Sequence, residues 1–242
     1  MRRVEKSTKL DLERIIFIGR TFEEYMNMFS LSLDEMRGKR ILDCPAGACS
    51  FTAHGSDLGL DITACDIAYD HEVEQLKQKG IQDIEHAMLH MEKVKDNYIW
   101  DYYHDVDGLR QNRIKALNDC TKHMVNASEQ YIPVVLPNLP FKNEEFDILL
   151  TANFLFMYAD RLDYDFHINT IEELLRVTRE EIRIFPLVDL EGKRYEHLDK
   201  VIAHLMEKGL EVKEVKEVKE VKVSYEFQAN ANTMLQISKK KR

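Results

Sequence analysis

The stretch RILDCPAGACSF, Arg40 to Phe51, gives the first indication of the fold. A short apolar run ends in Asp43, a loop with Gly47 at its centre follows, and a helix is predicted directly after the loop. This order of strand, glycine-containing loop and helix is typical of α/β proteins that bind a nucleotide at the carboxyl end of a strand. Pro45 and Cys49 stand where such loops usually carry further glycines.

The segments on either side of this stretch alternate between strands and helices. A strand is predicted at 61–66 and ends in Asp66, and helices at 50–59 and 70–80 end at Gly59 and Gly80. Further strands are predicted at 131–137, 146–151, 181–188 and 233–238, with helices at 163–179 and 194–209. The pattern predicts an α/β protein of three layers, with a seven-stranded, mostly parallel sheet and an antiparallel hairpin at one edge.

The domain organisation has three further features. We expect one domain over residues 1–242, with a helical insertion at about 81–130 and an N-terminal helical segment at about 10–36. Thr21 and Glu24 have the spacing of a capping box at the start of a helix. The repeat EVKEVKEVKEVK fits neither helical nor strand periodicity, and we expect a strand towards Val221–Phe227, with the earlier repeats extending it or the preceding helix.

Composition restricts the functional classes. The chain has 242 residues, 44% hydrophobic and 32% charged, and it shows neither a secretory signal nor an apolar run of membrane-spanning length. A cytoplasmic location without membrane association is therefore expected. The net charge of −9 disfavours nucleic acid as a partner, because an acidic surface repels phosphates. The four cysteines lack zinc-site spacing, so we expect no metal and inert, buried thiols.

Asp66 and Gly47 together indicate the kind of cofactor. An acid at the end of the second strand, about 20 residues after the loop, can accept both ribose hydroxyls of an adenosine. A dinucleotide needs three loop glycines so that its pyrophosphate can reach backbone N–H groups, and Pro45 and Cys49 crowd that approach. A cofactor without phosphate does not need those donors, so an adenosyl sulfonium is favoured over NAD.

The chain resembles the class I S-adenosylmethionine-dependent methyltransferases. The resemblance lies in ILDCPAGACSF, ITACD, LPFKNEEFDILLTANFLF and ELLRVTREEIRIFPL, and it covers about residues 38–237 apart from the insertion. It implies a Rossmann-like methyltransferase fold and S-adenosylmethionine as cofactor. The cofactor-binding residues that it implies are Asp43, Ala46, Gly47 and Ala48 for the methionine portion, Asp66 for the ribose, Ile67 for the adenine, and Asn153 and Phe154 beside the methyl group, with Arg20 or Tyr25 closing over the site.

The resemblance implies methyl transfer to a small-molecule acceptor. The family often has an acid near the end of the third strand for the adenine amino group, whereas Asn138 is the only polar candidate here. This departure, with Pro45 and Cys49, keeps open a catalytically inactive binding or scaffold protein, and an NAD-dependent oxidoreductase is a third reading. Candidate catalytic contributors are His54, Tyr69, His71, Asn153 and Tyr158, and the aromatic cluster Tyr98, Trp100, Tyr102 and Tyr103 could cover a ligand or serve packing.

Overall fold

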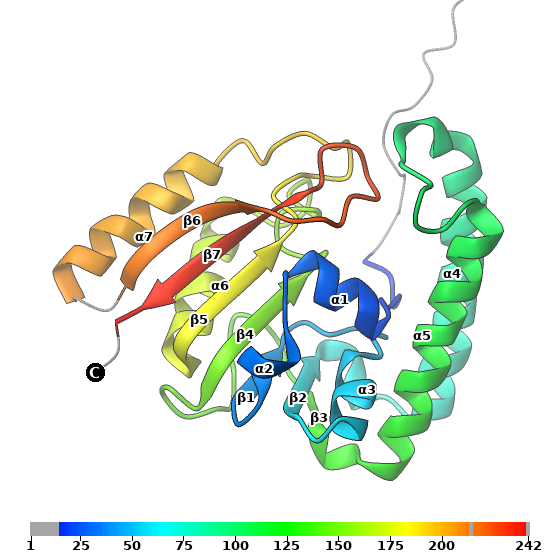
Figure 1. The fold of residues 1–242 in the computed structure, drawn as a ribbon, viewed down its shortest axis with the longest axis horizontal. Coiled ribbons are helices and arrows are strands. Elements are labelled where there is room, and N and C mark those ends of the chain that lie inside the picture. The colour runs from blue at the N-terminus through cyan, green and yellow to red at the C-terminus, as the bar shows by residue number, and fades with distance from the viewer. Residues whose placement is uncertain (1–14, 213–214, 241–242) are drawn as a thin grey trace, which may run out of the picture.

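The structure, a computed structural model, describes residues 15–212 and 215–240. Seven strands form one sheet in the order β3-β2-β1-β4-β5-β7-β6 (Figure 1). They are β1 (Arg40–Asp43), β2 (Asp61–Asp66), β3 (Tyr131–Pro133), β4 (Phe146–Ala152), β5 (Thr178–Phe185), β6 (Val215–Lys222) and β7 (Thr233–Lys239). The pairings from β3 to β5 are parallel, and β7 is antiparallel to both of its neighbours. The predicted fold class is confirmed, and β6 rather than the last strand takes the edge.

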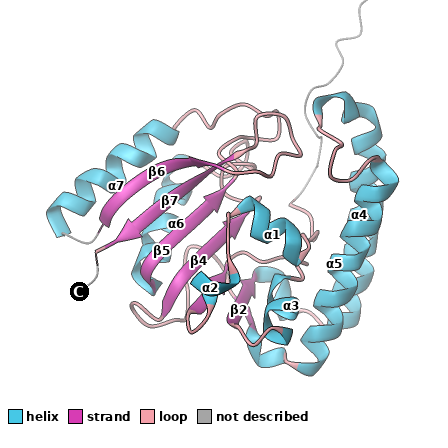
Figure 2. Ribbon diagram, viewed as in Figure 1, coloured by secondary structure: helices cyan, strands magenta, loops and turns pink. Residues whose placement is uncertain are grey.

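Helices cover both faces of the sheet (Figure 2). They are α1 (Phe22–Met28), α2 (Leu33–Met36), α3 (Phe51–Asp57), α4 (Val73–Val94), α5 (Val106–Asn126), α6 (Tyr164–Val177) and α7 (Leu198–Val212). Successive strand residues face opposite layers: Ile41 packs with α1, α3, α4 and α5, whereas Leu42 packs with α6 and α7. In the part of the chain described, no helix combines the length and apolarity that crossing a membrane requires.

The two long helices α4 and α5 pack side by side beyond the β3 edge (Figure 1). The predicted helix end at Gly80 is wrong, because α4 continues through this residue to Val94. A Cβ on Gly80 would lie 2.6 Å from Cδ1 of Leu117, a buried residue of α5. Glycine is therefore used here for close helix packing. The residues predicted as an insertion, 81–130, hold most of α4 and all of α5.

The N-terminal region departs from the predicted helical segment. Residues 10–14 lie outside the described residues, 15–20 have no regular secondary structure, and only α1 and α2 are helical. The predicted capping box is confirmed: the Thr21 hydroxyl accepts from the Glu24 N–H at 3.3 Å, and the Glu24 carboxylate accepts from the Thr21 N–H at 2.8 Å. The helix predicted over residues 15–20 is wrong, because the apolar side chains of Ile15 to Ile18 line a cavity from a segment without regular structure.

The EVK repeat is divided between two elements. Helix α7 runs to Val212, past the predicted end at Gly209, and β6 begins at Val215. The strand expected towards Val221–Phe227 lies earlier in the chain and ends at Lys222. The antiparallel partner β7 determines this position, since its backbone groups pair with Val215 to Lys222. The alternating lysines and glutamates of this edge strand hinder pairing with a further chain.

Candidate functional site

The loop after β1 and the acid that ends β2 meet at the carboxyl edge of the sheet. Gly47 has a φ of +56°, and its N–H donates to Oδ2 of Asp66 at 2.9 Å. Parallel pairing of β1 with β2 aligns Asp43 with Ala64, which places the two strand ends side by side. The Tyr69 hydroxyl donates to the Gly47 carbonyl at 2.7 Å and holds the loop in place. The two features that indicated an adenosine site therefore touch.

Asp66 lies half-buried with both carboxylate oxygens hydrogen-bonded. Oδ2 accepts from Gly47, and Oδ1 accepts from the Ala68 N–H at 2.8 Å. Burial raises the pKa of this carboxyl, and the two backbone donors oppose the rise. Because a carboxylate has about four acceptor positions, each oxygen retains a lone pair for an additional donor.

Asp43 takes a different position from Asp66. Its side chain is fully buried, and Oδ1 lies 3.0 Å from the Tyr25 hydroxyl of α1. Oδ2 has no hydrogen-bond partner among the described residues. Burial raises the pKa of Asp43 to about 8, the charge of Asp66 adds to the rise, and the Tyr25 hydrogen bond opposes it.

A cavity of about 540 Å³ opens beside this corner of the sheet. Six of the nine predicted cofactor-binding residues line it: Ala46, Gly47, Asp66, Ile67, Asn153 and Phe154. Asp43 and Ala48 are buried outside the lining, and Asn138 is exposed outside it. Ile67 is 64% exposed and lies at the cavity wall.

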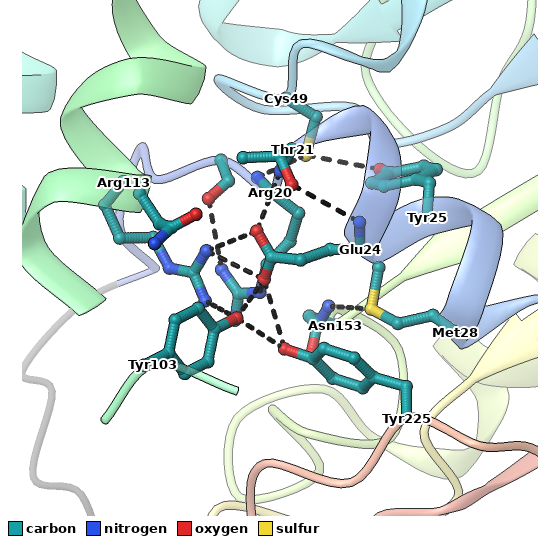
Figure 3. A network of polar contacts seen from close by, with 12 residues as sticks. Arg20, Thr21, Glu24, Tyr25, Met28, Cys49, Tyr103, Arg113, Asn153 and Tyr225 are labelled. Atoms are coloured by element: carbon teal, nitrogen blue, oxygen red, sulfur yellow. Dashed lines mark hydrogen bonds and ion pairs between the residues drawn. The ribbon is translucent and has the colours of Figure 1, made fainter. Parts of the chain in front are cut away.

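Asn153 follows β4 with a φ of +52°. Its N–H donates to the Phe185 carbonyl at 2.7 Å, and Nδ2 lies 3.5 Å from the Met28 sulfur (Figure 3). Asparagine adopts this left-handed conformation more readily than most residues. This turn places Asn153 in the cavity lining at the end of β4, the neighbour of β1.

Residues 15–20, which we call the N-terminal strap, run across the loop after β1. The sequence indicated Arg20 or Tyr25 as closing over the site; Arg20 lines the cavity, whereas Tyr25 is fully buried outside the lining, and the other strap residues were not predicted. The Arg20 N–H donates to the Cys49 sulfur at 3.2 Å, and the Ser50 N–H donates to the Arg20 carbonyl at 3.0 Å. A Cβ on Gly19 would lie 1.9 Å from the Ala48 carbonyl oxygen. Cys49 thus serves as the anchor of the strap, which explains why a side chain replaces the usual glycine.

The other end of the strap contacts the insertion. The Phe17 N–H donates to Oδ2 of Asp83 in α4 at 2.7 Å, and Lys79 pairs with the same carboxylate. Strap residues Ile15, Ile16, Phe17 and Ile18 line the cavity. Burial raises the pKa of Cys49 to about 12, so this thiol stays protonated at neutral pH, in agreement with the expectation of an inert cysteine.

A buried polar network lies between α1 and α5 (Figure 3), and its Arg113 lines the cavity. Arg113 is 1% exposed, and its Nη1 donates to both oxygens of Glu24 at 2.9 and 2.8 Å. The Tyr103 hydroxyl contacts Glu24 and Arg113, and Tyr225 donates to Glu24 at 3.1 Å. Burial acts to raise the pKa of Glu24, but Arg113, Arg20 and the hydrogen bonds from Thr21 and Tyr103 together lower it below its ordinary value. The network joins α1 to α5 and to the loop after β6.

The candidate catalytic residues separate into two groups. His71, Tyr158 and Asn153 line the cavity. His54 instead lies 2.9 Å from Asp119 on α5, and Tyr69 supports the loop. The aromatic cluster serves packing: the rings of Tyr98, Trp100 and Tyr103 lie 4.8 to 5.3 Å from that of Phe227, which does line the cavity.

Comparison with solved structures finds methyltransferases at low similarity. The magnesium protoporphyrin IX methyltransferase of Synechocystis, solved with bound SAM, is 12% identical at a TM-score of 0.42, covering 86% of this chain and 73% of that one. A SAM-dependent methyltransferase of Aquifex aeolicus is 13% identical at a TM-score of 0.39, covering 89% and 92%. The tRNA (m1A58) methyltransferase of the same organism is 9% identical at a TM-score of 0.40, covering 91% and 69%.

With TM-scores below 0.5, the fold class rests on this chain's own strand order and connections. The sheet with its inserted antiparallel β7 has the class I methyltransferase arrangement. No family model matches the sequence. The chain belongs to the same family as the uncharacterized protein MJ0045 of Methanocaldococcus jannaschii, with 35% identity over 229 residues, 94% of this chain and 98% of that protein.

Proposed function

We propose that this protein transfers a methyl group from S-adenosylmethionine to a small-molecule acceptor. The observation that carries the proposal is the contact between the Gly47 N–H and the Asp66 carboxylate at the rim of the cavity. It joins a carboxylate suited to ribose hydroxyls to a tight glycine turn at one edge of a parallel sheet, where such proteins bind ligands.

The residues of the cavity fit this cofactor. Asp66 keeps lone pairs for the two ribose hydroxyls, and Ile67 offers an apolar surface for the adenine. Ala46 and Gly47 would hold the methionine portion, with Asn153 beside it at the end of the neighbouring strand. When bound, S-adenosylmethionine supplies an electrophilic methyl group on a sulfonium. The protein's contribution is to orient the acceptor and exclude water, which can supply several kcal/mol through proximity.

The acceptor is proposed to be a small molecule because helices and the N-terminal strap wall the cavity on several sides. Helices α4 and α5 contribute Met88, Met91 and Leu109 to the cavity wall, and all three are buried. The N-terminal strap covers another side. The net charge of −9 also disfavours a nucleic acid as acceptor, because an acidic surface repels phosphates.

Titration calorimetry with S-adenosylhomocysteine tests the proposal. We expect binding to the wild type and about 10- to 100-fold weaker binding to Asp66→Asn, since a hydrogen bond to a charged group contributes about 1.5–3 kcal/mol. Asp61→Asn is the matched control, because Asp61 is exposed at the opposite end of the same strand. Absence of both heat and a thermal shift at millimolar ligand would contradict the proposal and favour the scaffold alternative.

A further inference from the structure

The cavity wall carries more than one cation, and the cations differ in how well they are paired. Arg113 has its Nη1 on both oxygens of Glu24, and Lys79 pairs with the buried Asp83. Asp66, the acidic residue of the lining, accepts one backbone N–H on each oxygen and makes no recorded ion pair with Arg20. Arg20 is the remaining fixed cation of the lining described here.

Arg20 is poorly satisfied by the described residues. Its Nε is buried without a hydrogen bond, and the nearest recorded carboxylate oxygen, Oε1 of Glu24, lies 3.7 Å away. That oxygen already accepts from Arg113 at 2.9 Å and from Tyr225 at 3.1 Å. The contact from Nη1 of Arg20 to the Gly19 carbonyl is long, at 3.4 Å. A guanidinium in such surroundings gains from a further anionic partner, because its Nε has lost water without a replacement and its ion pair with Glu24 is long.

The walls that extend from Arg20 towards the insertion are apolar. Phe17 comes from the N-terminal strap, Met88 and Met91 from α4, Leu109 from α5, and Phe227 from the loop after β6. All five are less than 9% exposed and face the same cavity. Methionines adapt their shape to apolar ligands more readily than branched side chains do.

We propose that the cavity accepts an acceptor molecule with an apolar body and one carboxylate, and that Arg20 binds this carboxylate. The proposal rests on the proposed methyl transfer and names the substrate class. Arginine suits the role because its planar fork matches a carboxylate with two parallel hydrogen bonds. Arg20 is thus a specificity-determining residue, held in place by the backbone contacts of the N-terminal strap with Cys49 and Ser50.

The test compares two ligands of the same length, octanoate and octanamide, by titration calorimetry in the presence and absence of S-adenosylhomocysteine. We expect octanoate to bind wild-type protein at least 10-fold more tightly than octanamide. Arg20→Gln should abolish this preference, and Arg20→Lys, which retains the charge, should keep part of it. Arg161→Gln is the control, because Arg161 stacks on Tyr158 outside the cavity lining and its loss should leave the preference intact. Equal binding of both ligands to the wild type, or a preference unchanged in Arg20→Gln, would overturn the proposal.

The carboxylate of the cofactor is the other source of the same chemistry. S-adenosylhomocysteine carries this group and methylthioadenosine lacks it, so the affinities of both are measured for wild type and Arg20→Gln. If Arg20→Gln weakens the binding of S-adenosylhomocysteine but not of methylthioadenosine, Arg20 binds the cofactor carboxylate and the acceptor assignment is overturned. If the substitution changes the affinities of these two nucleosides equally, the acceptor assignment is supported. If S-adenosylhomocysteine does not bind at all, the proposed function fails, while an octanoate preference that depends on Arg20 still supports the carboxylate site.

Discussion

Glu24→Gln tests the buried network that joins α1 to α5 beside the cavity. The substitution keeps the size of the side chain but removes the charge that compensates Arg113, which is 1% exposed. It also turns one acceptor oxygen into a donor facing Tyr103 and Tyr225. Breaking a buried ion pair by removing one partner costs about 3–5 kcal/mol, and we expect a loss of this size in the free energy of unfolding.

Urea unfolding followed by circular dichroism measures this loss. Glu180→Gln provides the control, since Glu180 pairs with Lys39 at 2.6 Å near the surface, where such a pair contributes at most about 1 kcal/mol. Arg113→Met combined with Glu24→Gln should be less destabilising than the sum of the single variants, because the pair is coupled. A loss below about 1 kcal/mol for Glu24→Gln, or strict additivity, would show that the network does not stabilise the fold in this way.

Three further variants probe the strap, the loop and the cavity. Gly19→Ala should lower the free energy of unfolding in urea by at least about 2 kcal/mol, because the new Cβ would meet the Ala48 carbonyl. Gly38→Ala is the control: Gly38 has open space around it, and its substitution should cost about 1 kcal/mol. Equal losses in the two variants would argue against a strap packed on the loop. Asp43 has a pKa raised to about 8 in the folded state and about 4 when unfolded, so folding binds a proton between these values and wild-type stability falls as pH rises through them. Asp43→Asn should lack that fall between pH 5 and pH 8, and an unchanged pH dependence would contradict the assignment. Ile67→Ala should weaken the binding of S-adenosylhomocysteine several-fold, as measured by calorimetry. Leu89→Ala should leave this binding unchanged, because Leu89 is 66% exposed outside the lining. Equal effects of the two substitutions would show that Ile67 is not part of the site.

The sheet was predictable from the sequence because its signals are local. The apolar run before Asp43 and the alternation before Asp66 reflect burial of each strand, and the turn at Gly47 needs a residue that tolerates positive φ. Parallel pairing then brings the strand ends together, so the contact between Gly47 and Asp66 follows from topology.

The remaining features depend on partners that are distant in the chain. Gly80 reads as a helix end until Leu117, from a different helix, is seen to occupy the space of its side chain. Cys49 reads as an obstruction in the loop until the strap residue Arg20 is seen to bond to it. The ion pair between Glu24 and Arg113 could not be predicted, because the two residues are 89 positions apart in the chain.

The affinity of adenosine relative to 2′,3′-dideoxyadenosine tests whether Asp66 is a ribose-binding residue. Calorimetric titration of both nucleosides should show adenosine binding at least about 10-fold more tightly to the wild type, because two hydroxyls donate to a carboxylate. The difference should vanish in Asp66→Asn and persist in Asp61→Asn. Equal binding of the two nucleosides to the wild type, or a preference that survives Asp66→Asn, would contradict an adenosine site at this corner of the sheet.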